Sequence, residues 1–424
     1  MSATISVSVI MPLYDADLAD GAKVVGNIYP AGGTGAAHRN VLFPCGSSAT
    51  AARYDVHAGH YIVSATLPSG AVLSEDAEAQ EGQETRVALD ASGSPYETYA
   101  WQYLMGNIEP YSVYHGTGDI PVPRSSGSRI TGAPGREFTA PAHAVWIGNP
   151  ARNSWSFASM LALAHDTPHK PMADLMAESP PCVISRPDAT DETCHLFRFG
   201  PDGPVSTPVD PLPHGPRQFL VVRPAAVPHI VTLPVPWDSA LIEVLVNDRR
   251  SPTGSPISVT VRDNVLGPAL GYMARGALDA AATLVKDAAF PLDATTRNPL
   301  VAAAGAYVLM GTELSNRTRR RNSWLSNLRD RADWMSDGSV LWAVQQLRQA
   351  RTDAELRRAR DGLIEAYDRG VPIYTLGLSH LMDGLSEFPD DRECARRLDQ
   401  ARRLSWRVDM REPFVIVRSR GRLE

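Results

Sequence analysis

Lysine is nearly missing from this chain. Of the 41 basic residues, three are lysine (Lys23, Lys170 and Lys286) and the other 38 are arginine. Alanine is also abundant, and the two biases together indicate a GC-rich bacterial genome. A second interpretation is that the chain uses the planar guanidinium fork, which binds carboxylates and phosphates through two hydrogen bonds at once. The shortage by itself favours no particular partner.

Cysteine is scarce as well. The four cysteines lie far apart and form no CxxC pair; they are Cys45, Cys182, Cys194 and Cys394. This spacing excludes a zinc site of paired thiolates and a disulfide framework, and it is typical of a reducing compartment. We therefore expect a cytoplasmic protein whose thiols are free and bind no metal.

Long apolar runs are also missing. No run approaches the roughly 20 residues that a membrane-spanning helix needs, and the first residues, MSATISVSVIMPLYDADL, lack the cationic and apolar parts of a secretory signal. Hydrophobic residues make up 43% and charged residues 21% of the 424 residues, which is the composition of a folded chain. A chain of this length accommodates two or three domains.

Charge is distributed unevenly along the chain. Residues 317–424 hold 22 arginines and 17 acidic residues, a net charge of +5. The preceding 316 residues hold 19 basic and 30 acidic groups, a net charge of −11, and both parts together give the formal −6. We expect the two parts to attract each other or to recruit different partners. A nucleic-acid-binding domain usually shows a stronger bias, with a pI above about 9.

The first 91 residues predict a β-sandwich. Ile5, Val7 and Val9 alternate with serines, which is the period of a half-buried strand. Turn residues separate six further candidate strands, at Val24–Ile28, Asn40–Phe43, Ala52–Val56, His60–Leu67, Ala71–Ala79 and Thr85–Leu89. Seven short strands spaced by about ten residues are typical of an all-β sandwich.

The stretch Tyr54–Asp90 (YDVHAGHYIVSATLPSGAVLSEDAEAQEGQETRVALD) resembles the small prealbumin-like sandwiches of the carboxypeptidase-regulatory type. Gly59 and Tyr61 match the turn and the aromatic residue of that family, and Gly82 precedes its closing strand. Ala58 departs from the pattern, because many members have proline there. The resemblance implies an accessory or adhesive module without catalytic positions, in which Tyr61 packs in the core.

Two further segments precede the helical part. Residues 92–142 are rich in proline, glycine and aromatic residues and predict a linker, in which we expect Tyr96–Leu104 to dock on a neighbouring domain or to bind a partner. Residues 143–265 predict a β-rich middle domain with short helices at Phe157–Leu163 and Met172–Met176. Its candidate strands are Ala144–Ile147, His195–Phe199, Gln218–Arg223, His229–Val235, Leu241–Val246 and Ile257–Arg262.

Residues 266–424 have helical periodicity. The expected helices are two within Pro268–Ala289, broken at Gly276, and then Pro299–Gly311, Ser323–Met335, Ser339–Ala350, Asp353–Arg369, Tyr374–Phe388 and Asp391–Ser405. Their short connections predict a helical bundle or a short α-solenoid. We expect Gly370 to end one helix, Pro372 to begin the next and Asp390 to cap the last. The segment Pro413–Val417 predicts a strand that returns to the middle domain.

The beginning of the helical part weakly resembles the tetratricopeptide repeats. The residues Tyr272, Gly276, Ala281, Val285 and Ala288 have nearly the spacing of one such unit. The front of the motif is missing, and no second copy follows at the family's period of about 34 residues. The resemblance implies helical repeats that supply a binding surface.

No diagnostic catalytic motif is present. The chain lacks GxSxG, HExxH and GxGxxG, and Gly32–Gly35 lacks the ending of a phosphate-binding loop. The densest polar group is His165, Asp166 and His169, and two histidines four apart on a helix would suit zinc. Pro168 interrupts such a helix, so we expect a loop there. The sequence therefore identifies no metal site.

Cys194 and His195 are neighbours in a predicted strand. Successive side chains of a strand point to opposite faces, so these two cannot form a thiolate–imidazolium pair with each other. Cys194 could still meet a distant histidine such as His214 or His229, although nothing in the spacing selects one. We expect a buried structural cysteine.

The basic cluster Arg317, Arg319, Arg320 and Arg321, followed by Trp324, is the sharpest candidate for partner binding. Guanidinium groups at this spacing would contact an acidic protein surface or phosphates, and an arginine-directed protease would find a cleavage site there. The alternative is a solvated loop between two helices, partly neutralised by nearby aspartates.

The predicted fold class is therefore a multidomain β plus α protein, with a β-sandwich (1–91), a linker (92–142), a β-rich middle domain (143–265) and an all-α module (266–424). This architecture favours a non-catalytic interaction or regulatory protein of the adaptor type. It would bind a protein partner through the helical surface and Arg317–Arg321. One variant is a partner or substrate of a protease in a bacterial defence or signalling system, because Pro121–Arg136 carries three arginines between folded parts.

Two alternatives belong to other functional classes. The first is a hydrolase of unrecognised family with a site in the middle domain, built from His165, Asp166, His169 and His195. The second is nucleic-acid binding by the basic helical module. We expect no cofactor, no bound metal and no membrane association.

Overall fold

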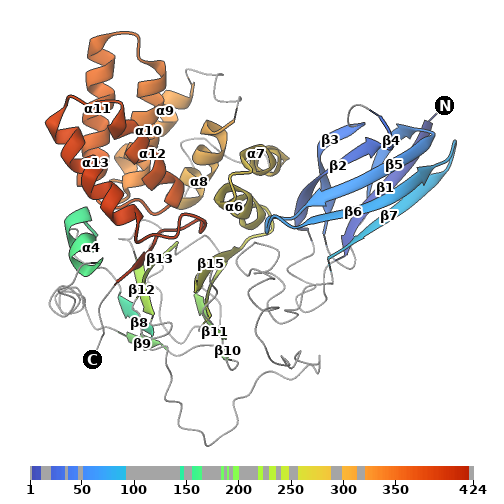
Figure 1. The fold of residues 1–424 in the computed structure, drawn as a ribbon, viewed down its shortest axis with the longest axis horizontal. Helices are drawn as coiled ribbons and strands as arrows, with labels where there is room; N and C mark the ends of the chain where they lie inside the picture. Colours follow the sequence, from blue (N-terminus) through green and yellow to red (C-terminus); the bar gives the residue numbers. More distant parts are fainter. Residues whose placement is uncertain are drawn as a thin grey trace, which may run out of the picture. The chain divides into compact units, whose positions relative to one another are not determined.

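The computed structural model describes residues 2–10, 21–33, 37–45, 51–91, 144–147, 155–164, 183–185, 189–190, 194–199, 218–222, 229–234, 240–247, 256–287, 298–312 and 320–419. The chain forms two compact units, coloured along the sequence in Figure 1. The first comprises Met1–Ser128, Pro252–Gly254 and Arg262–Phe290, and the second comprises Arg129–Ser251, Ser255–Val261 and Pro291–Glu424. Each unit is described by itself.

The N-terminal part of the first unit is a sandwich of two sheets, as the sequence predicted. Its strands are β1 (Ser2–Ile10), β2 (Lys23–Pro30), β3 (His38–Pro44), β4 (Ala52–His57), β5 (Gly59–Thr66), β6 (Val72–Ala79) and β7 (Glu84–Asp90). One sheet has the order β4-β1-β7 and the other the order β3-β2-β5-β6. All the neighbours pair antiparallel except β1 and β7, which run parallel.

Alternating apolar residues build the core between the two sheets. Ile5, Val7 and Val9 of β1 are all completely buried, as their period of two predicts. Tyr61 also lies in this core, 6% exposed, and its hydroxyl donates a hydrogen bond to the carbonyl of His57 at 2.9 Å. The prediction that Tyr61 is structural is therefore confirmed.

Two helices belong to the same unit as the sandwich. They are α6 (Leu266–Ala274) and α7 (Leu278–Asp287), and Gly276 separates them with φ +74°, a conformation that glycine adopts without strain. The buried hydroxyl of Tyr272 donates to the carbonyl of Thr66 and accepts from the amide of Val25 at 3.1 Å. These bonds tie α6 to β5 and β2.

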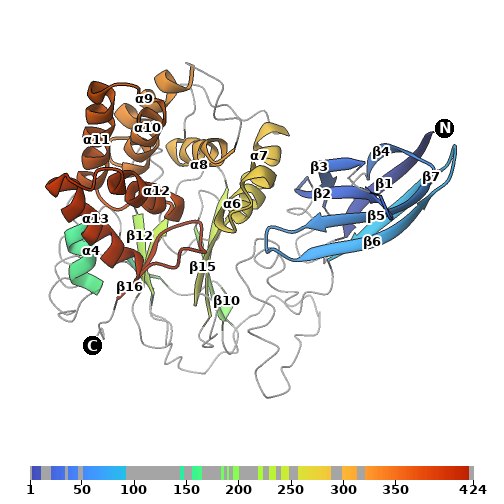
Figure 2. The same ribbon diagram turned by 45° about the horizontal axis from the view of Figure 1, so that its top comes forward.

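The middle of the chain contributes two sheets to the second unit (Figure 2). The strands are β8 (Ala144–Ile147), β9 (Val183–Ser185), β10 (Ala189–Thr190), β11 (Cys194–Phe199), β12 (Gln218–Val222), β13 (His229–Leu233), β14 (Leu241–Asn247) and β15 (Ile257–Arg262). One sheet has the order β10-β11-β14-β15. In the other, β16-β13-β12-β8-β9, the edge strand β16 (Ile416–Arg418) comes from the C-terminal segment. The predicted return of Pro413–Val417 to the middle region is thus confirmed.

β15 is buried on both faces, although its alternation of apolar and polar residues is the pattern of a strand with one wet face. Ser258 and Thr260 are each 2% exposed. The hydroxyl of Ser258 donates to Oε1 of Glu412 at 3.2 Å, so the C-terminal segment covers the polar side of the strand. A satisfied hydroxyl can be buried at little cost, which is why the alternation did not signal exposure.

The helices of the second unit are α4 (Phe157–Ala164), α8 (Pro299–Met310), α9 (Arg320–Arg331), α10 (Ser336–Gln349), α11 (Asp353–Asp368), α12 (Thr375–Ser386) and α13 (Arg392–Ser405). Among them, α10 packs against α8, α9, α11 and α12. The predicted all-α character of the C-terminal region is confirmed. No helix of the described residues combines the length and the apolar character needed to cross a membrane.

Helix ends follow the predicted signals with two corrections. Gly370 ends α11 with φ +113°, as expected. α13 is capped by Asp391 and not by Asp390, since the carboxylate of Asp391 accepts from the amides of Glu393 and Cys394. α12 begins at Thr375 and not at Pro372, because buried hydrogen bonds hold the intervening residues in an extended connection.

Several predicted features lie outside the described residues. They are the linker 92–142 with Tyr96–Leu104 and the arginine-bearing segment Pro121–Arg136, the short helix Met172–Met176, and the histidine group 165–169.

Candidate interaction surface

The predicted basic cluster is only partly described by the structure. Arg317 and Arg319 lie outside the described residues, and Arg320 and Arg321 are placed by their backbone as the first two residues of α9. Trp324, one turn further along α9, is half-buried. The described residues therefore bring no surface together from this cluster, and its role in partner binding stays a prediction.

Many arginines of the helical part are used inside the fold. Arg329 of α9 binds the carboxylate of Glu365 of α11, with Nη2 and Oε2 at 2.8 Å, and its guanidinium lies 4.4 Å from the ring centre of Trp342. Arg369 approaches the same carboxylate at 2.6 Å. One acidic side chain thus joins two helices through two guanidinium forks, which a lysine could not do with the same geometry.

Two more arginine clamps join α11 to α13. Nε of Arg360 lies 2.6 Å from Oδ2 of Asp391, and Nη2 of Arg397 lies 3.0 Å from Oδ1 of Asp368. The ion pair lowers the pKa of Asp391 to about 2, first through the hydrogen bond from Arg360 and then through the capping amide of Cys394. Part of the arginine content of residues 317–424 therefore joins helices to one another.

Trp406 is the most exposed large apolar side chain of the described residues, at 88%. It caps the C-terminus of α13, where its amide donates to the carbonyls of Arg402 and Leu404. Most tryptophans are largely buried, since the indole is the largest side chain. Single exposed apolar side chains are common on protein surfaces, and tryptophan is among the residue types most enriched at the centres of protein interfaces.

Arginines surround this indole. Arg402 and Arg403 lie one turn before Trp406, which places them on the same side of α13, and Arg407 follows directly. Met410, 37% exposed, lies after the turn. We call these five residues the Trp406 surface. Residues 399–411 contain four arginines and two aspartates, which leaves a local charge of +2.

The backbone beneath the Trp406 surface is fixed on both sides. On the helix side Cys394, Ala401 and Leu404 are completely buried. After the turn, Val408 forms a bridge with Val417, and the amide of Arg418 donates to the carbonyl of Arg407 at 2.9 Å. The indole therefore stands on a rigid support, and a partner would bind it without first ordering the chain.

Sequence reasoning missed this surface. The expected helix Asp391–Ser405 ends directly before Trp406, and periodicity gives this residue no role. The available signal is its position: the inward positions of α13 follow Cys394, Leu398 and Ala401, and Trp406 falls outside that stripe. The spacing shows that the residue faces away from the core, whereas only the structure shows that no neighbouring described element covers it.

A buried polar cluster lies elsewhere in the helices, and its chemistry is structural. The carboxylate of Asp337 is completely buried at the first turn of α10. It accepts from the hydroxyl of Tyr307 at 2.8 Å and from the amides of Ile373 and Tyr374 at 2.8 and 3.3 Å. Burial raises the pKa of both tyrosines well above its usual value. The cluster ties α8, α10 and the connection before α12 together.

Metal-binding and thiol chemistry were the candidate catalytic features of the described residues. They contain no group of three or more histidine, cysteine or acidic side chains that could hold a metal. Cys45 and Cys394 are buried free thiols, and burial raises the pKa of the Cys45 thiol to about 12 and that of Cys394 to about 11, so neither is a thiolate at neutral pH. Of the proposed hydrolase residues, His195 is placed by its backbone in β11, and His165, Asp166 and His169 lie outside the described part.

One family model matches the helical part of the chain, over residues 268–415. That stretch is similar to the Y4kD C-terminal domain. The match begins within α6, ends directly before β16 and includes the Trp406 surface; it covers about a third of the chain. No curated protein and no solved structure matches the chain.

Proposed function

We propose that this protein is a non-catalytic interaction protein that binds an acidic protein partner through the Trp406 surface. The observation that supports this proposal is the 88% exposure of Trp406 on a rigid helix end, with arginines around it. Tryptophan and arginine are the residue types most enriched among the few that dominate binding energy at protein interfaces. An acidic partner complements the local charge of +2 and would be steered to the surface electrostatically.

The other modules fit the same function as additional binding surfaces. The helical module, which weakly resembles tetratricopeptide repeats, would present the Trp406 surface, with Arg317, Arg319, Arg320, Arg321 and Trp324 as a second contact. The sandwich would be a prealbumin-like accessory module of the carboxypeptidase-regulatory type. We place the protein in the bacterial cytoplasm and keep, as one form of the proposal, a partner that is a protease in defence or signalling.

Affinity purification of the full-length tagged protein from its native cells, followed by mass spectrometry, tests the proposal. The wild type is compared with Trp406→Ala and with Arg402→Glu, which reverses one charge of the surface. Leu356→Ala is the matched control, because Leu356 is an exposed apolar residue (39%) on α11 of the same unit. We expect a stoichiometric partner that both surface variants lose and the control retains.

Binding to the purified partner then gives the magnitude. A central tryptophan contact contributes about 2 kcal/mol or more, so Trp406→Ala should weaken binding by roughly 30-fold or more. Thermal unfolding of the variants should be unchanged, since the indole makes few contacts in the free protein. A partner that binds wild type and Trp406→Ala equally well would contradict the proposal.

The same material tests the two alternatives from other classes. Nucleic-acid binding predicts that an oligonucleotide binds at low salt and that affinity falls steeply as salt rises. A metal-dependent hydrolase predicts stoichiometric zinc in the purified protein. Either result, together with the absence of a protein partner, would replace the interaction proposal.

A further inference from the structure

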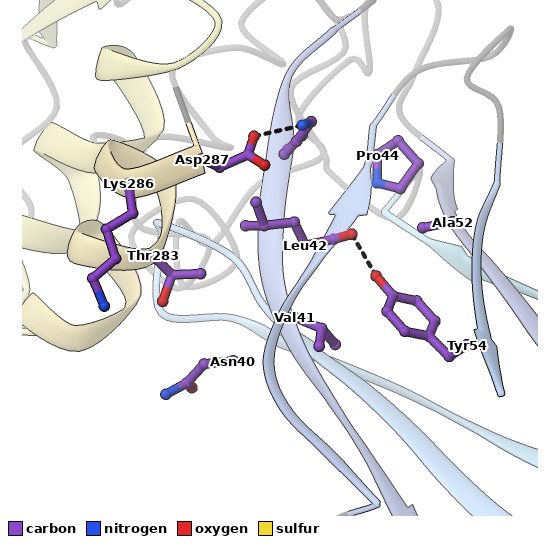
Figure 3. Close-up of a pocket in the computed structure, with 10 residues that line it drawn as sticks. Asn40, Val41, Leu42, Pro44, Ala52, Tyr54, Thr283, Lys286 and Asp287 are labelled. Carbon is purple, nitrogen blue, oxygen red and sulfur yellow. Dashed lines mark hydrogen bonds and ion pairs between the residues drawn. The ribbon is translucent and has the colours of Figure 1, made fainter. Parts of the chain in front are cut away.

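A pocket of about 730 Å³ opens in the first unit between the sheet β3-β2-β5-β6 and α7. Its apolar lining comprises Val41, Leu42 and Pro44 of β3 with Ala52 of β4. Figure 3 shows Thr283 and Lys286 of α7 on one side, Val41 and Leu42 of β3 across from them, and Asn40 below Thr283. This volume lies within the usual range of small-molecule sites, about 300–1,000 Å³.

Two of the three lysines of the chain line this pocket. Lys23 is held by Asp287, with Nζ and Oδ2 2.6 Å apart, so that pair is neutral overall. Lys286 has no carboxylate partner among the described residues. The pocket therefore carries one uncompensated positive charge, in a chain that otherwise uses arginine for its cations.

Asn40 brings a second unused polar group to the same pocket. Among the described residues it is the one residue other than glycine with a positive φ, of 50°. Its amide donates to Oδ1 of Asn27 at 3.0 Å, which fixes the backbone, whereas its own carboxamide has no partner in the described part of the chain. Asparagine adopts this left-handed conformation readily, and the β-bulge between β2 and β3 accounts for it here.

The remaining polar groups of the lining are occupied. The hydroxyl of Tyr54 donates to the carbonyl of Leu42 at 2.7 Å, and that of Thr283 donates to the carbonyl of Asp279 at 2.9 Å. Thr283 keeps lone pairs and offers no second donor. The free donors of the pocket are thus the ammonium group of Lys286, the carboxamide of Asn40 and the N–H groups of Lys23 that do not face Asp287.

We infer that this pocket binds a small organic carboxylate with an apolar body. The carboxylate would pair with Lys286 and accept from the carboxamide of Asn40, and the apolar body would lie on Leu42 and Pro44, which share one face of β3. One net positive charge matches a monoanion. A phosphate monoester carries a charge of about −1.5 to −2 at neutral pH, which exceeds the single net positive charge of the lining. This inference is independent of the Trp406 surface, which lies in the other unit.

Two sources supply this chemistry: a free short branched carboxylic acid and the free C-terminus of a peptide that ends in an apolar residue. The test titrates isotopically labelled full-length protein with isovalerate, with its neutral analogue isovaleramide, and with acetyl-Ala-Ala-Leu bearing a free or an amidated C-terminus. Amide chemical shifts of residues 40–44 and 283–287 report binding. Tighter binding of the free peptide than of isovalerate would assign the peptide terminus, and the reverse order would assign the free acid.

Three variants complete the experiment. Lys286→Gln removes the charge, and Asn40→Gly removes the carboxamide while it keeps the positive φ accessible. Arg86→Gln is the matched control, because Arg86 is an exposed cation on β7 of the same unit and does not line the pocket. For an exposed ion pair we expect Lys286→Gln to weaken isovalerate binding by about threefold to tenfold. Asn40→Gly should have a similar effect and Arg86→Gln none.

The contrary results are equally specific. Binding of isovalerate and isovaleramide with equal affinity would show that the negative charge of the ligand does not contribute to binding. Equal weakening by Arg86→Gln and Lys286→Gln would show non-specific attraction. The absence of any shift in residues 40–44 and 283–287 with every probe would overturn the inference.

Discussion

Removal of the Asp337 carboxylate should be among the most destabilising substitutions in the helical part. The carboxylate accepts from one hydroxyl and two backbone amides, and it is completely buried. Asp337→Ala leaves these three donors without that acceptor in a dry interior. Each buried unsatisfied donor costs roughly 1–3 kcal/mol, and the relief of burying a charge offsets part of the sum. We expect a net loss of about 3–6 kcal/mol in the free energy of unfolding.

Asp337→Asn separates charge from shape. The carboxamide keeps one acceptor oxygen. Its NH₂ group, however, is a donor, and it faces a donor from which the carboxylate oxygen had accepted a hydrogen bond. We therefore expect about half the loss of Asp337→Ala. Asp399→Ala is the control, since Asp399 forms an exposed pair with Arg403 and should cost less than about 0.5 kcal/mol.

Urea unfolding measures these losses, and native-state hydrogen exchange locates them. The amides of Ile373 and Tyr374 donate directly to Asp337, so their protection should fall more than that of amides in α13. A loss below about 1 kcal/mol for Asp337→Ala would refute the argument that the three bonds are made in a water-free interior. Unchanged protection at Ile373 and Tyr374 would refute their assignment as donors.

Two further predictions concern single contacts. Tyr272→Phe removes the acceptor of the Val25 amide. We expect a loss of about 1–2 kcal/mol in the unfolding free energy and faster hydrogen exchange at Val25. Exchange that stays at the wild-type rate would contradict the bond between α6 and β2. Asp391 has a pKa near 2 in the folded protein and 3.8 as its ordinary value, so its ionised form stabilises the fold above about pH 4, and that stabilisation is lost as the pH falls towards 2. Asp391→Asn keeps the helix cap without the charge and should flatten the dependence of unfolding temperature on pH across that window. An unchanged slope would show that the ion pair with Arg360 does not cause the pH dependence.

Local physics made most of the secondary structure predictable from the sequence. Alternation in Ile5–Val9 and helical spacing in the last third gave the right element types, because the two periods follow from backbone geometry alone. Gly276 and Gly370 marked helix ends, because each sits at a positive φ that other residues adopt with strain. The prediction of the α13 cap was off by one residue, since two adjacent aspartates are equivalent in sequence and only one has the geometry to accept from the first turn.

Tertiary structure decided which residues meet, and that is where function lies. The sequence showed an excess of arginine after residue 317 but could not divide it between clamps such as Arg329–Glu365 and the arginines near Trp406. It also gave no reason to group Lys23 with Lys286, which are far apart along the chain and line one pocket. Periodicity tells which way a side chain points from its own helix or strand. Contacts between distant segments depend on how the elements pack. Only the folded chain therefore distinguishes an arginine that joins two helices from one that is available to a partner.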